Sequence, residues 1–355
     1  NKKFGSNDRK QVSHLCYSYF RLGQALQHLP TEERVLAGLF LCAQHPNELL
    51  EAVKPDWNEL IALRSDEKAT ILKFFIEDIF PWRGELSEGV DSKIFSTSFL
   101  IQPDLFLRLR HGKEEIVRQK LHLANISFNE IHPSCISLEN AVQANQVVEL
   151  DREAVVQDYN SQRVGEFLQS IPEASPLRVY DCCAGSGGKS ILANDILENI
   201  HLTVSDIRES ILLNLKKRFE TAGIRNYSAF VEDLSTSNHK PKTENRKLST
   251  FDLLICDAPC SGSGTWSRTP EQLYYFRPEK IEYYRNLQKN ILENAVPLVK
   301  EGGYLLYITC SVFKKENEEI VEFLEKEFKL RIEKKELLGG YDKKADTLFA
   351  ALLQK

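Results

Sequence analysis

Two cysteines, each at the end of an apolar segment, are the residues of this chain best suited to covalent chemistry. Cys260 follows the segment FDLLICDAP, and Cys310 ends the segment GGYLLYITC. Both segments are typical of buried parallel strands, whose carboxyl ends meet at one edge of a sheet, so both thiols should face one crevice. Asp257 lies in the same turn as Cys260. Thiols beside a carboxyl group that exchanges protons predict nucleophilic catalysis.

A glycine-rich turn, DCCAGSGGKS, joins another apolar segment to a helical one. Its glycines allow a ligand to approach the backbone closely, as nucleotide-like cofactors do in α/β sheets. The turn nearly matches the phosphate-binding loop G-x-x-x-x-G-K-[ST], since Gly188, Lys189 and Ser190 fit, but Cys183 stands at the first glycine position. The turn alone therefore leaves a nucleoside triphosphate and a cofactor without phosphates both open.

Acidic residues at two further strand ends favour the cofactor without phosphates. Asp206 ends HLTVSD, where a carboxylate can accept hydrogen bonds from ribose hydroxyls, and Asp233 ends NYSAFVED. Repeated negative charge opposes a triphosphate and suits S-adenosylmethionine, whose sulfonium is a cation. The alternative is that both carboxylates only cap the helices that follow them.

A thiol beside a methyl donor suits methylation of carbon 5 of a pyrimidine. A thiolate that adds to carbon 6 makes carbon 5 nucleophilic, while an acid, for which Asp257 is well placed, bonds ring nitrogen 3. A base then removes the proton on carbon 5, and the thiol leaves. DNA methylases of this chemistry attack with the cysteine of a Pro-Cys pair, which selects Cys260 after Pro259, but Cys310 is a second candidate.

The other cysteines and the composition set the wider expectations. Most of these thiols are expected to be buried and inert, namely Cys16, Cys42, Cys135, Cys182 and Cys256. There is no C-x-x-C pair, and no histidine is near Cys260 or Cys310, so no metal site is predicted. Without a signal sequence or a long apolar run, the protein is expected to be a cytoplasmic monomer with reduced thiols and no membrane span.

Strand and helix patterns alternate from about residue 175 onward. Such alternation is needed if Cys260 and Cys310 are to lie at one edge of a parallel sheet. This alternation predicts an α/β fold with a doubly wound, mostly parallel sheet, closed by two antiparallel strands. The predicted strands are residues 177–184, 201–207, 226–233, 251–259, 302–310, 330–337 and 347–355. The predicted helices are residues 189–198, 210–222, 279–299 and 316–327.

Two smaller units precede the alternating region, which gives predicted domains at 1–80, 81–150 and 151–355. Residues 1–80 have helical spacing throughout, including the run 71–79, and residues 81–98 are expected to be a connector. In residues 105–110, leucines alternate with Phe106, Arg108 and Arg110, which predicts a strand with one basic, aromatic face. The formal net charge is -5, so RNA binding would depend on placed residues such as these and the arm Lys240–Lys247.

The chain resembles the Sun/Fmu, or RsmB-like, family of RNA (cytosine-5)-methyltransferases. The resemblance rests on DAPCSGSGT and TCS, with support from VQDYNSQ and DCCAGSGGK. It implies a Rossmann-like methyltransferase domain, preceded by an RRM-like α+β subdomain and an all-helical NusB-like module. It also implies S-adenosylmethionine as cofactor and RNA, most plausibly ribosomal RNA, as substrate.

The resemblance assigns roles to individual residues. Cys310 is the nucleophile, Cys260 assists product release, Asp257 contacts the cytosine and Lys189 lies near the reacting groups. The implied cofactor contacts are Cys183, Ala184, Gly185, Ser186, Gly187, Gly188, Lys189, Asp206, Asp233 and Asp257. The expected RNA contacts are Arg108, Arg110 and Arg268.

The chain departs from the family pattern at two places. Gly185 and Ser186 replace the usual Ala-Pro of the cofactor loop, and Arg110 stands where an asparagine is usual. Three alternatives remain at this point. They are the same chemistry on transfer RNA, an RNA-binding ribosome-assembly factor with a vestigial methyltransferase domain, and a nucleotide hydrolase that uses GSGGKS.

Overall fold

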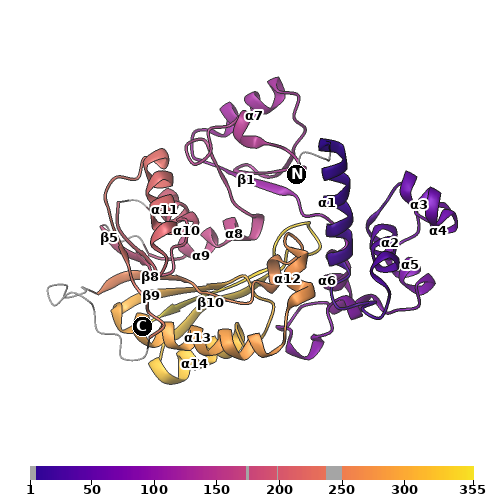
Figure 1. The fold of residues 1–355 in the computed structure, drawn as a ribbon. Helices are drawn as coiled ribbons and strands as arrows, with labels where there is room; N and C mark the ends of the chain where they lie inside the picture. Colours follow the sequence, from indigo (N-terminus) through magenta and orange to yellow (C-terminus); the bar gives the residue numbers. More distant parts are fainter. Residues whose placement is uncertain (1–4, 173–175, 198, 237–249) are drawn as a thin grey trace.

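The fold is that of a computed structural model, which describes residues 5–172, 176–197, 199–236 and 250–355 (Figure 1). The predicted basic arm Lys240–Lys247 lies outside these residues. Among the helices that the structure describes, none is long and apolar enough to cross a membrane.

A seven-stranded sheet forms the centre of the second half of the chain (Figure 1). Its strands are β5 (Leu177–Asp181), β6 (Ile200–Asp206), β7 (Tyr227–Val231), β8 (Phe251–Asp257), β9 (Val299–Thr309), β10 (Arg331–Leu338) and β11 (Leu348–Gln354). The order across the sheet is β10-β11-β9-β8-β5-β6-β7. Strands β5 to β9 run parallel, and β11 is antiparallel to both of its neighbours. The predicted α/β fold with two closing antiparallel strands is confirmed.

Helices cover both faces of this sheet, because its central strands are apolar on both sides. The helices are α9 (Gly165–Leu168), α10 (Gly188–Ile196), α11 (Glu209–Ala222), α13 (Glu279–Ala295) and α14 (Glu318–Phe328). Side chains of α9, α10 and α11 form one apolar core against the sheet, and those of α13 and α14 form the other. The carboxyl ends of β5, β6, β8 and β9 remain clear for a site.

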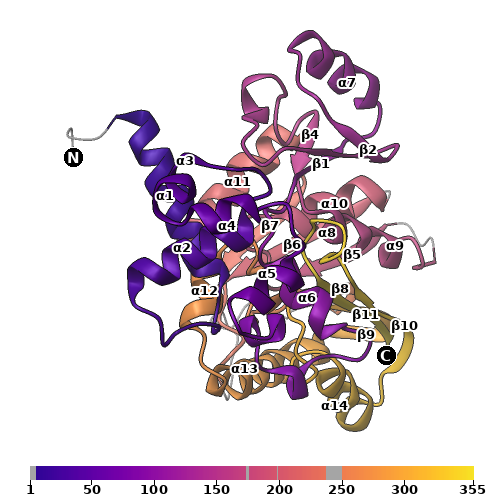
Figure 2. The same cartoon turned by 90° about the vertical axis from the view of Figure 1, so that its right-hand side faces the viewer.

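A four-stranded antiparallel sheet, in the order β2-β3-β1-β4, lies beside the large one (Figure 2). Its elements are β1 (Leu105–Leu109), α7 (Glu114–Leu123), β2 (Asn129–His132), β3 (Cys135–Leu138) and β4 (Ala154–Val156). Apolar side chains of β1 and β3 pack against Val117 and Leu121 of α7. Since β4 pairs with β1, this unit extends past the predicted boundary at residue 150.

The prediction that β1 presents a basic, aromatic face to RNA is wrong. Phe106 and Arg108 are 3% and 7% exposed, because this face packs against the catalytic half of the chain. Arg108 donates to Asp195 Oδ2 at 2.6 Å and to Gln157 Oε1 at 2.7 Å. Arg110 donates to Asp195 Oδ1 at 2.6 Å. Alternation shows that a strand has two faces, but it cannot show that an acidic neighbour, rather than solvent, covers the basic one.

The N-terminal part is helical, as predicted, but its helices are shorter and more numerous. They are α1 (Ser6–Arg21), α2 (Thr31–Cys42), α3 (Glu48–Val53), α4 (Pro55–Glu59) and α5 (Ser65–Ile71). The predicted helical run 71–79 is wrong, because α5 ends at Ile71, Lys73 has a φ of 57°, and only a 3-10 turn follows at Ile76–Ile79. Phe75, read as apolar helix face, is 76% exposed.

The expected connector at residues 81–98 is part of a shared apolar core. It contains α6 (Ser92–Ser98), and Phe80, Phe95 and Phe99 pack in one cluster with Trp266 and Phe313 of the catalytic half. Trp266 and Phe313 lie just beyond the two predicted catalytic motifs. The N-terminal helices and the catalytic loops therefore share one core.

Candidate active site

Cys260 and Cys310 lie next to each other beyond the ends of β8 and β9, as their strand-end positions predict. The backbone N–H of Cys310 donates to Cys260 Sγ at 3.3 Å. Burial raises the pKa of the Cys310 thiol, with a further rise from Asp257 that the nearby Lys189 opposes. Burial also raises the pKa of Cys260, as do Cys310 and Glu316. Both thiols are protonated at neutral pH, so an attack requires a proton acceptor.

Lys189 forms an ion pair with Asp257 beside Cys310. Its Nζ lies 3.0 Å from Asp257 Oδ2 and donates to Ser161 Oγ at 2.8 Å. Burial lowers the pKa of Lys189, but Asp257 and Cys310 raise it more, so the amine stays charged. A fixed positive charge stabilises a thiolate at Cys310. Asp257 raises the pKa of Cys310 and Lys189 lowers it, whereas Cys310 and Glu316 both raise the pKa of Cys260. Lys189 is therefore the feature that favours Cys310 as the nucleophile.

The same contacts oppose the phosphate-binding-loop interpretation. That interpretation requires Lys189 to reach phosphates and the Ser190 hydroxyl to hold a magnesium ion. Lys189 is paired with Asp257, and Ser190 Oγ donates to Asp181 Oδ2 at 2.6 Å. Neither side chain is directed to a triphosphate.

Glu316 joins the two cysteine loops and was not singled out from the sequence. It is fully buried and accepts hydrogen bonds from the Ser261 N–H at 2.8 Å and the Ser311 hydroxyl at 2.9 Å. Ser261 follows Cys260, and Ser311 follows Cys310, so one carboxyl group fixes both loops. Burial raises the pKa of Glu316, although these hydrogen bonds oppose the rise. Its only sequence signal is an acidic residue in the turn KKENEE.

Asn317 and Gly264 complete the support of the loops. Asn317 Oδ1 accepts from Thr309 Oγ1 at 2.5 Å, and its Nδ2 donates to the Ser311 carbonyl at 2.9 Å. The N–H of Gly264 donates to the Cys310 carbonyl at 2.9 Å. A Cβ at Gly264 would lie 1.9 Å from the Thr347 carbonyl oxygen, so the loop requires glycine there.

Arg268, a predicted RNA contact, lies in a cluster of acidic residues near Cys310. Its Nε and Nη2 lie 2.8 Å from Asp346 Oδ1 and Asp158 Oδ2, and its Nη1 donates to the Asp104 carbonyl at 2.9 Å. Burial raises the pKa of Asp346, with a further rise from Asp158. With 27% of its side chain exposed, Arg268 positions these carboxylates and keeps some contact with solvent.

A pocket of about 480 Å³ adjoins Asp257 at the carboxyl ends of β5, β6, β7 and β8. Of the predicted cofactor contacts, Cys183, Asp206, Asp233 and Asp257 line it, and Tyr283 of α13 forms part of its opposite side. Larger hollows exist, but those reported for the described residues lack this combination of strand-end carboxylates and a catalytic-motif residue.

Asp206 and Asp233 are held as hydrogen-bond acceptors. Asp206 accepts from the Gly185 N–H at 3.0 Å and from Arg208 Nε at 2.9 Å. Burial raises the pKa of Asp206, but the bonds from Arg208 and Gly185 outweigh it, so the net pKa is lowered. Asp233 Oδ1 accepts from the Ser235 N–H at 2.9 Å. Asp206 also bonds the N–H of Arg208, which precedes α11, so it combines a local turn role with its place in the pocket.

The glycine loop presents open backbone at two positions. A Cβ at Gly187, where φ is 86°, would lie 2.7 Å from Phe219, so this position requires glycine. A Cβ at Gly185 or Gly188 would meet nothing within 4 Å, which leaves room for a ligand. Ser186 accepts a hydrogen bond from Arg218 at 3.0 Å through its carbonyl. The other predicted cofactor contacts are absent from the pocket lining, namely Ala184, Gly185, Ser186, Gly187, Gly188 and Lys189.

Comparisons with known proteins agree with this geometry. Residues 167–349 match the sequence model of a family described as 16S rRNA methyltransferase RsmB/F. The ribosomal RNA small subunit methyltransferase B of Proteus mirabilis (strain HI4320) is 30% identical over 230 residues, which cover 63% of this chain and 52% of that protein. The chain thus spans about half the length of the curated relatives it matches.

Solved structures show the same fold at low sequence identity. The crystal structure of PH0851 has a TM-score of 0.74 at 20% identity and covers 99% of this chain and 91% of that one. The structure of NSun6 from Pyrococcus horikoshii with SFG has a TM-score of 0.61 at 14% identity, with 74% and 95% covered.

Proposed function

Because the chain belongs to the RsmB/F family of 16S rRNA methyltransferases, we propose that it is an S-adenosylmethionine-dependent RNA (cytosine-5)-methyltransferase. The observation that carries the proposal is the pair of adjacent thiols, Cys260 and Cys310, near the Lys189–Asp257 ion pair, whose Asp257 also lines the carboxylate-lined pocket. A vestigial domain is not favoured, because all four side chains are present, Lys189 pairs with Asp257, and Cys310 bonds Cys260 through its backbone N–H.

The residues of the pocket fit S-adenosylmethionine, which is the cofactor. Asp206 and Asp233 offer carboxylate oxygens to hydroxyl and amine groups, and the open backbone at Gly185 allows close approach. The acidic lining suits a cationic group and disfavours phosphates. When bound there, S-adenosylmethionine supplies an electrophilic methyl group to a nucleophile on the Asp257 side of the pocket.

Cys310 acts as the nucleophile, and Asp257 receives its proton. The Cys310 sulfur forms a bond to carbon 6 of cytosine, the Lys189 ammonium stabilises the thiolate before attack, and the proton passes through Asp257 toward ring nitrogen 3. The carbon 5–carbon 6 electron pair is then available for the methyl group. In this order of steps, Asp257 has two roles: it transfers the proton and it orients the cytosine ring.

Cys260 acts in the second half of the reaction. After methyl transfer, carbon 5 carries both a proton and the new methyl group, and a base must remove that proton before the Cys310–carbon 6 bond can break. Cys260 lies against the backbone of Cys310, so its sulfur can accept this proton at short range once its own thiol proton has passed to solvent. Glu316 holds its loop at a fixed position during this step.

RNA reaches the site past Arg268 in this proposal. A hollow of about 930 Å³ runs between α1 and the small unit, and its lining includes Arg9, Lys10 and Arg268. Basic side chains along such a path suit a phosphate backbone. The substrate we propose is small-subunit ribosomal RNA. Cytoplasmic location, a monomeric state and Arg268 as an RNA contact stay predictions.

The test is methyl transfer from labelled S-adenosylmethionine to unmodified bacterial ribosomal RNA. The wild type should place label on carbon 5 of cytosine, Cys310→Ala should place none, and the matched control Cys135→Ala should behave like the wild type. Label on another base, or equal cytosine label with Cys310→Ala, would refute the proposed chemistry. Small-subunit RNA and transfer RNA assayed side by side decide the substrate class.

A further inference from the structure

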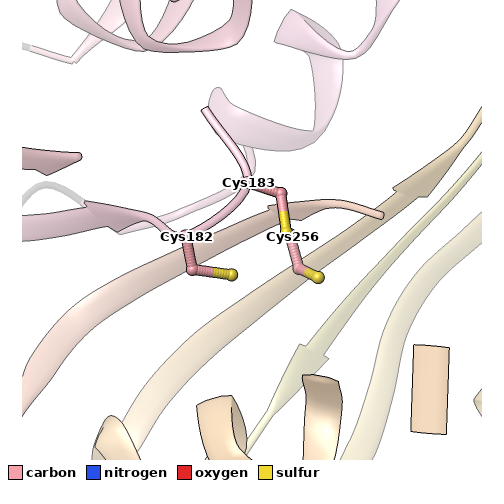
Figure 3. Close-up of side chains that lie close together, drawn as sticks. All are labelled: Cys182, Cys183 and Cys256. Carbon is pink, nitrogen blue, oxygen red and sulfur yellow. The ribbon is translucent and has the colours of Figure 1, made fainter. Parts of the chain in front are cut away.

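Three further thiols, those of Cys182, Cys183 and Cys256, lie together (Figure 3). Cys182 and Cys183 directly follow β5, and Cys256 is the penultimate residue of β8. The strands pair in parallel with Asp181 opposite Ile255, and this register places Cys182 beside Cys256. The three sulfur atoms lie within 4.8 Å of one another.

This spacing is close to that of a thiolate metal site. Zinc–sulfur bonds of about 2.3 Å put the bound sulfurs roughly 3.8 to 4.0 Å apart. The three thiols therefore need to approach by less than about 1 Å, which small side-chain rotations supply. Within the part of the chain that the structure describes, this is the one group of three or more His, Cys, Asp or Glu side chains found with metal-ligand spacing.

Two acidic residues flank the cluster in sequence. Asp181 precedes Cys182 at the end of β5, and Asp257 follows Cys256 at the end of β8. Metal binding releases the protons of thiol ligands, so the site does not require thiolates before the cation binds.

One side of the cluster is open. Cys256 is fully buried and Cys182 is 3% exposed, whereas Cys183 is partly exposed, and the lining of the carboxylate pocket includes Cys182 and Cys183. Three protein ligands with a fourth position open to water are the arrangement of an open zinc site. Soft thiolate ligands also select against magnesium and calcium.

We propose that Cys182, Cys183 and Cys256 form a binding site for one thiophilic divalent cation, Zn²⁺, whose fourth position faces the pocket. The absence of a C-x-x-C pair predicted no metal site, but the fold brings together two adjacent cysteines and a third from a neighbouring strand. The proposal does not rest on methyl transfer, because neither Cys260 nor Cys310 is a ligand. Cys182 and Cys183 also line the pocket assigned to S-adenosylmethionine, so cobalt binding is measured without that cofactor.

The test uses Co²⁺ alone as the probe, added to the reduced full chain. We expect one equivalent to bind with a thiolate-to-cobalt charge-transfer absorption, and Zn²⁺ to displace it. Cys256→Ala and Cys182→Ala should each weaken binding at least about tenfold, since even an outer-shell partner contributes that much. Cys135→Ala and Cys310→Ala should keep the absorption.

Circular dichroism identifies variants that fail to fold, and Cys183→Ser serves as a milder third variant on the exposed side. No charge-transfer absorption with the folded, reduced wild type overturns the proposal. An absorption that survives in Cys256→Ala and Cys182→Ala also overturns it. If hydrogen peroxide oxidises two of these thiols to a disulfide and no cobalt absorption is seen in the reduced chain, the cluster is a redox pair and not a cation site.

Discussion

Two groups of cysteines lie at the same edge of one sheet, yet their surroundings give them different chemistry. Cys310 has two charged neighbours, Lys189 and Asp257, and we propose that Asp257 receives its proton. Cys182 and Cys256 have mainly apolar neighbours and each other. The difference shows that a cysteine's position in the topology sets what it can reach, while neighbouring charges determine whether it attacks carbon or binds a cation.

Removing the charge of Lys189 should have the largest effect, because it should impair methyl transfer at Cys310 without affecting cobalt binding at the other cysteine group. Lys189→Met keeps the length of the side chain but leaves Asp257 unpaired and the Cys310 thiolate without its cation. We expect kcat for methyl transfer to fall by about 10² to 10⁴, as for loss of a group that aids proton transfer. Cobalt binding at Cys182, Cys183 and Cys256 should persist.

The matched control is Lys68→Met. Lys68 is a buried lysine of the N-terminal helices, and its Nζ donates to two backbone carbonyls. This variant should lower thermal stability but leave the pH profile of methyl transfer unchanged. An equal loss of kcat in both folded variants would mean that Lys189 acts only on folding.

Glu316→Gln tests whether the polar support belongs to the catalytic thiols alone. The Ser261 N–H and the Ser311 hydroxyl each donate to one carboxylate oxygen of Glu316. Glutamine replaces one of these oxygens with an NH₂ group, so one donor loses its acceptor. We expect a loss of about 1 to 3 kcal/mol in the free energy of unfolding, as for a buried donor left unsatisfied. Denaturant unfolding measures this, and the exposed Glu322→Gln is the control. Unchanged stability and kcat would contradict the role given to Glu316.

The pH dependence of alkylation should also distinguish Cys310. Its raised pKa keeps it a neutral thiol at pH values where an ordinary cysteine, with a pKa of about 8.5, begins to ionise. Its reaction with iodoacetamide should therefore be slow at pH 7.5 and keep rising at pH values where an added cysteine-containing reference peptide has reached its plateau. Peptide mass spectrometry measures both rates in one sample. A faster Cys310 at pH 7.5 would contradict the resting state described above.

The same shift has a consequence for stability. The folded state favours the protonated thiol, so the contribution of Cys310 is fully present below the unfolded pKa of about 8.5 and falls as the pH rises above it. Cys310→Ala should flatten the alkaline decline of stability. A steeper alkaline decline of stability in this variant would contradict the raised pKa assigned to Cys310.

Cys256→Val should have the smallest effect. Valine is of similar size and apolar, so we expect the free energy of unfolding to change by less than about 1.5 kcal/mol. Methyl transfer should stay within about threefold of the wild type while cobalt binding weakens, measured on the same preparation. A loss of methyl transfer equal to that of Cys310→Ala would contradict the division into a catalytic and a cation-binding group of cysteines.

Much of this arrangement was predictable from sequence, because parallel strands have one carboxyl edge. The period of the pattern and the position of each polar residue at a strand end were enough to place Cys260, Cys310, Asp206 and Asp257 together. The resemblance to the RsmB-like family is likewise confirmed by the family match over residues 167–349.

The rest depended on contacts between distant segments. The basic face of β1 is covered by Asp195, which comes 87 positions after Arg108, and no local pattern reports such a partner. Residues 81–98 are not a simple connector, because Phe95 and the following Phe99 pack in one apolar cluster with Trp266. The local sequence predicts Cys182 and Cys256 to be inert thiols, because their proximity depends on strand register. Glu316 was missed because one acidic residue in a charged turn has no distinctive spacing.

Trapping of the covalent intermediate tests the central claim most directly. Cys260→Ala, incubated with S-adenosylmethionine and small-subunit ribosomal RNA, should accumulate an RNA adduct that survives denaturing electrophoresis, because carbon 5 keeps its proton and Cys310 cannot leave. Cys310→Ala and the double variant should form none. An adduct in Cys310→Ala but not in Cys260→Ala would contradict the account and make Cys260 the nucleophile.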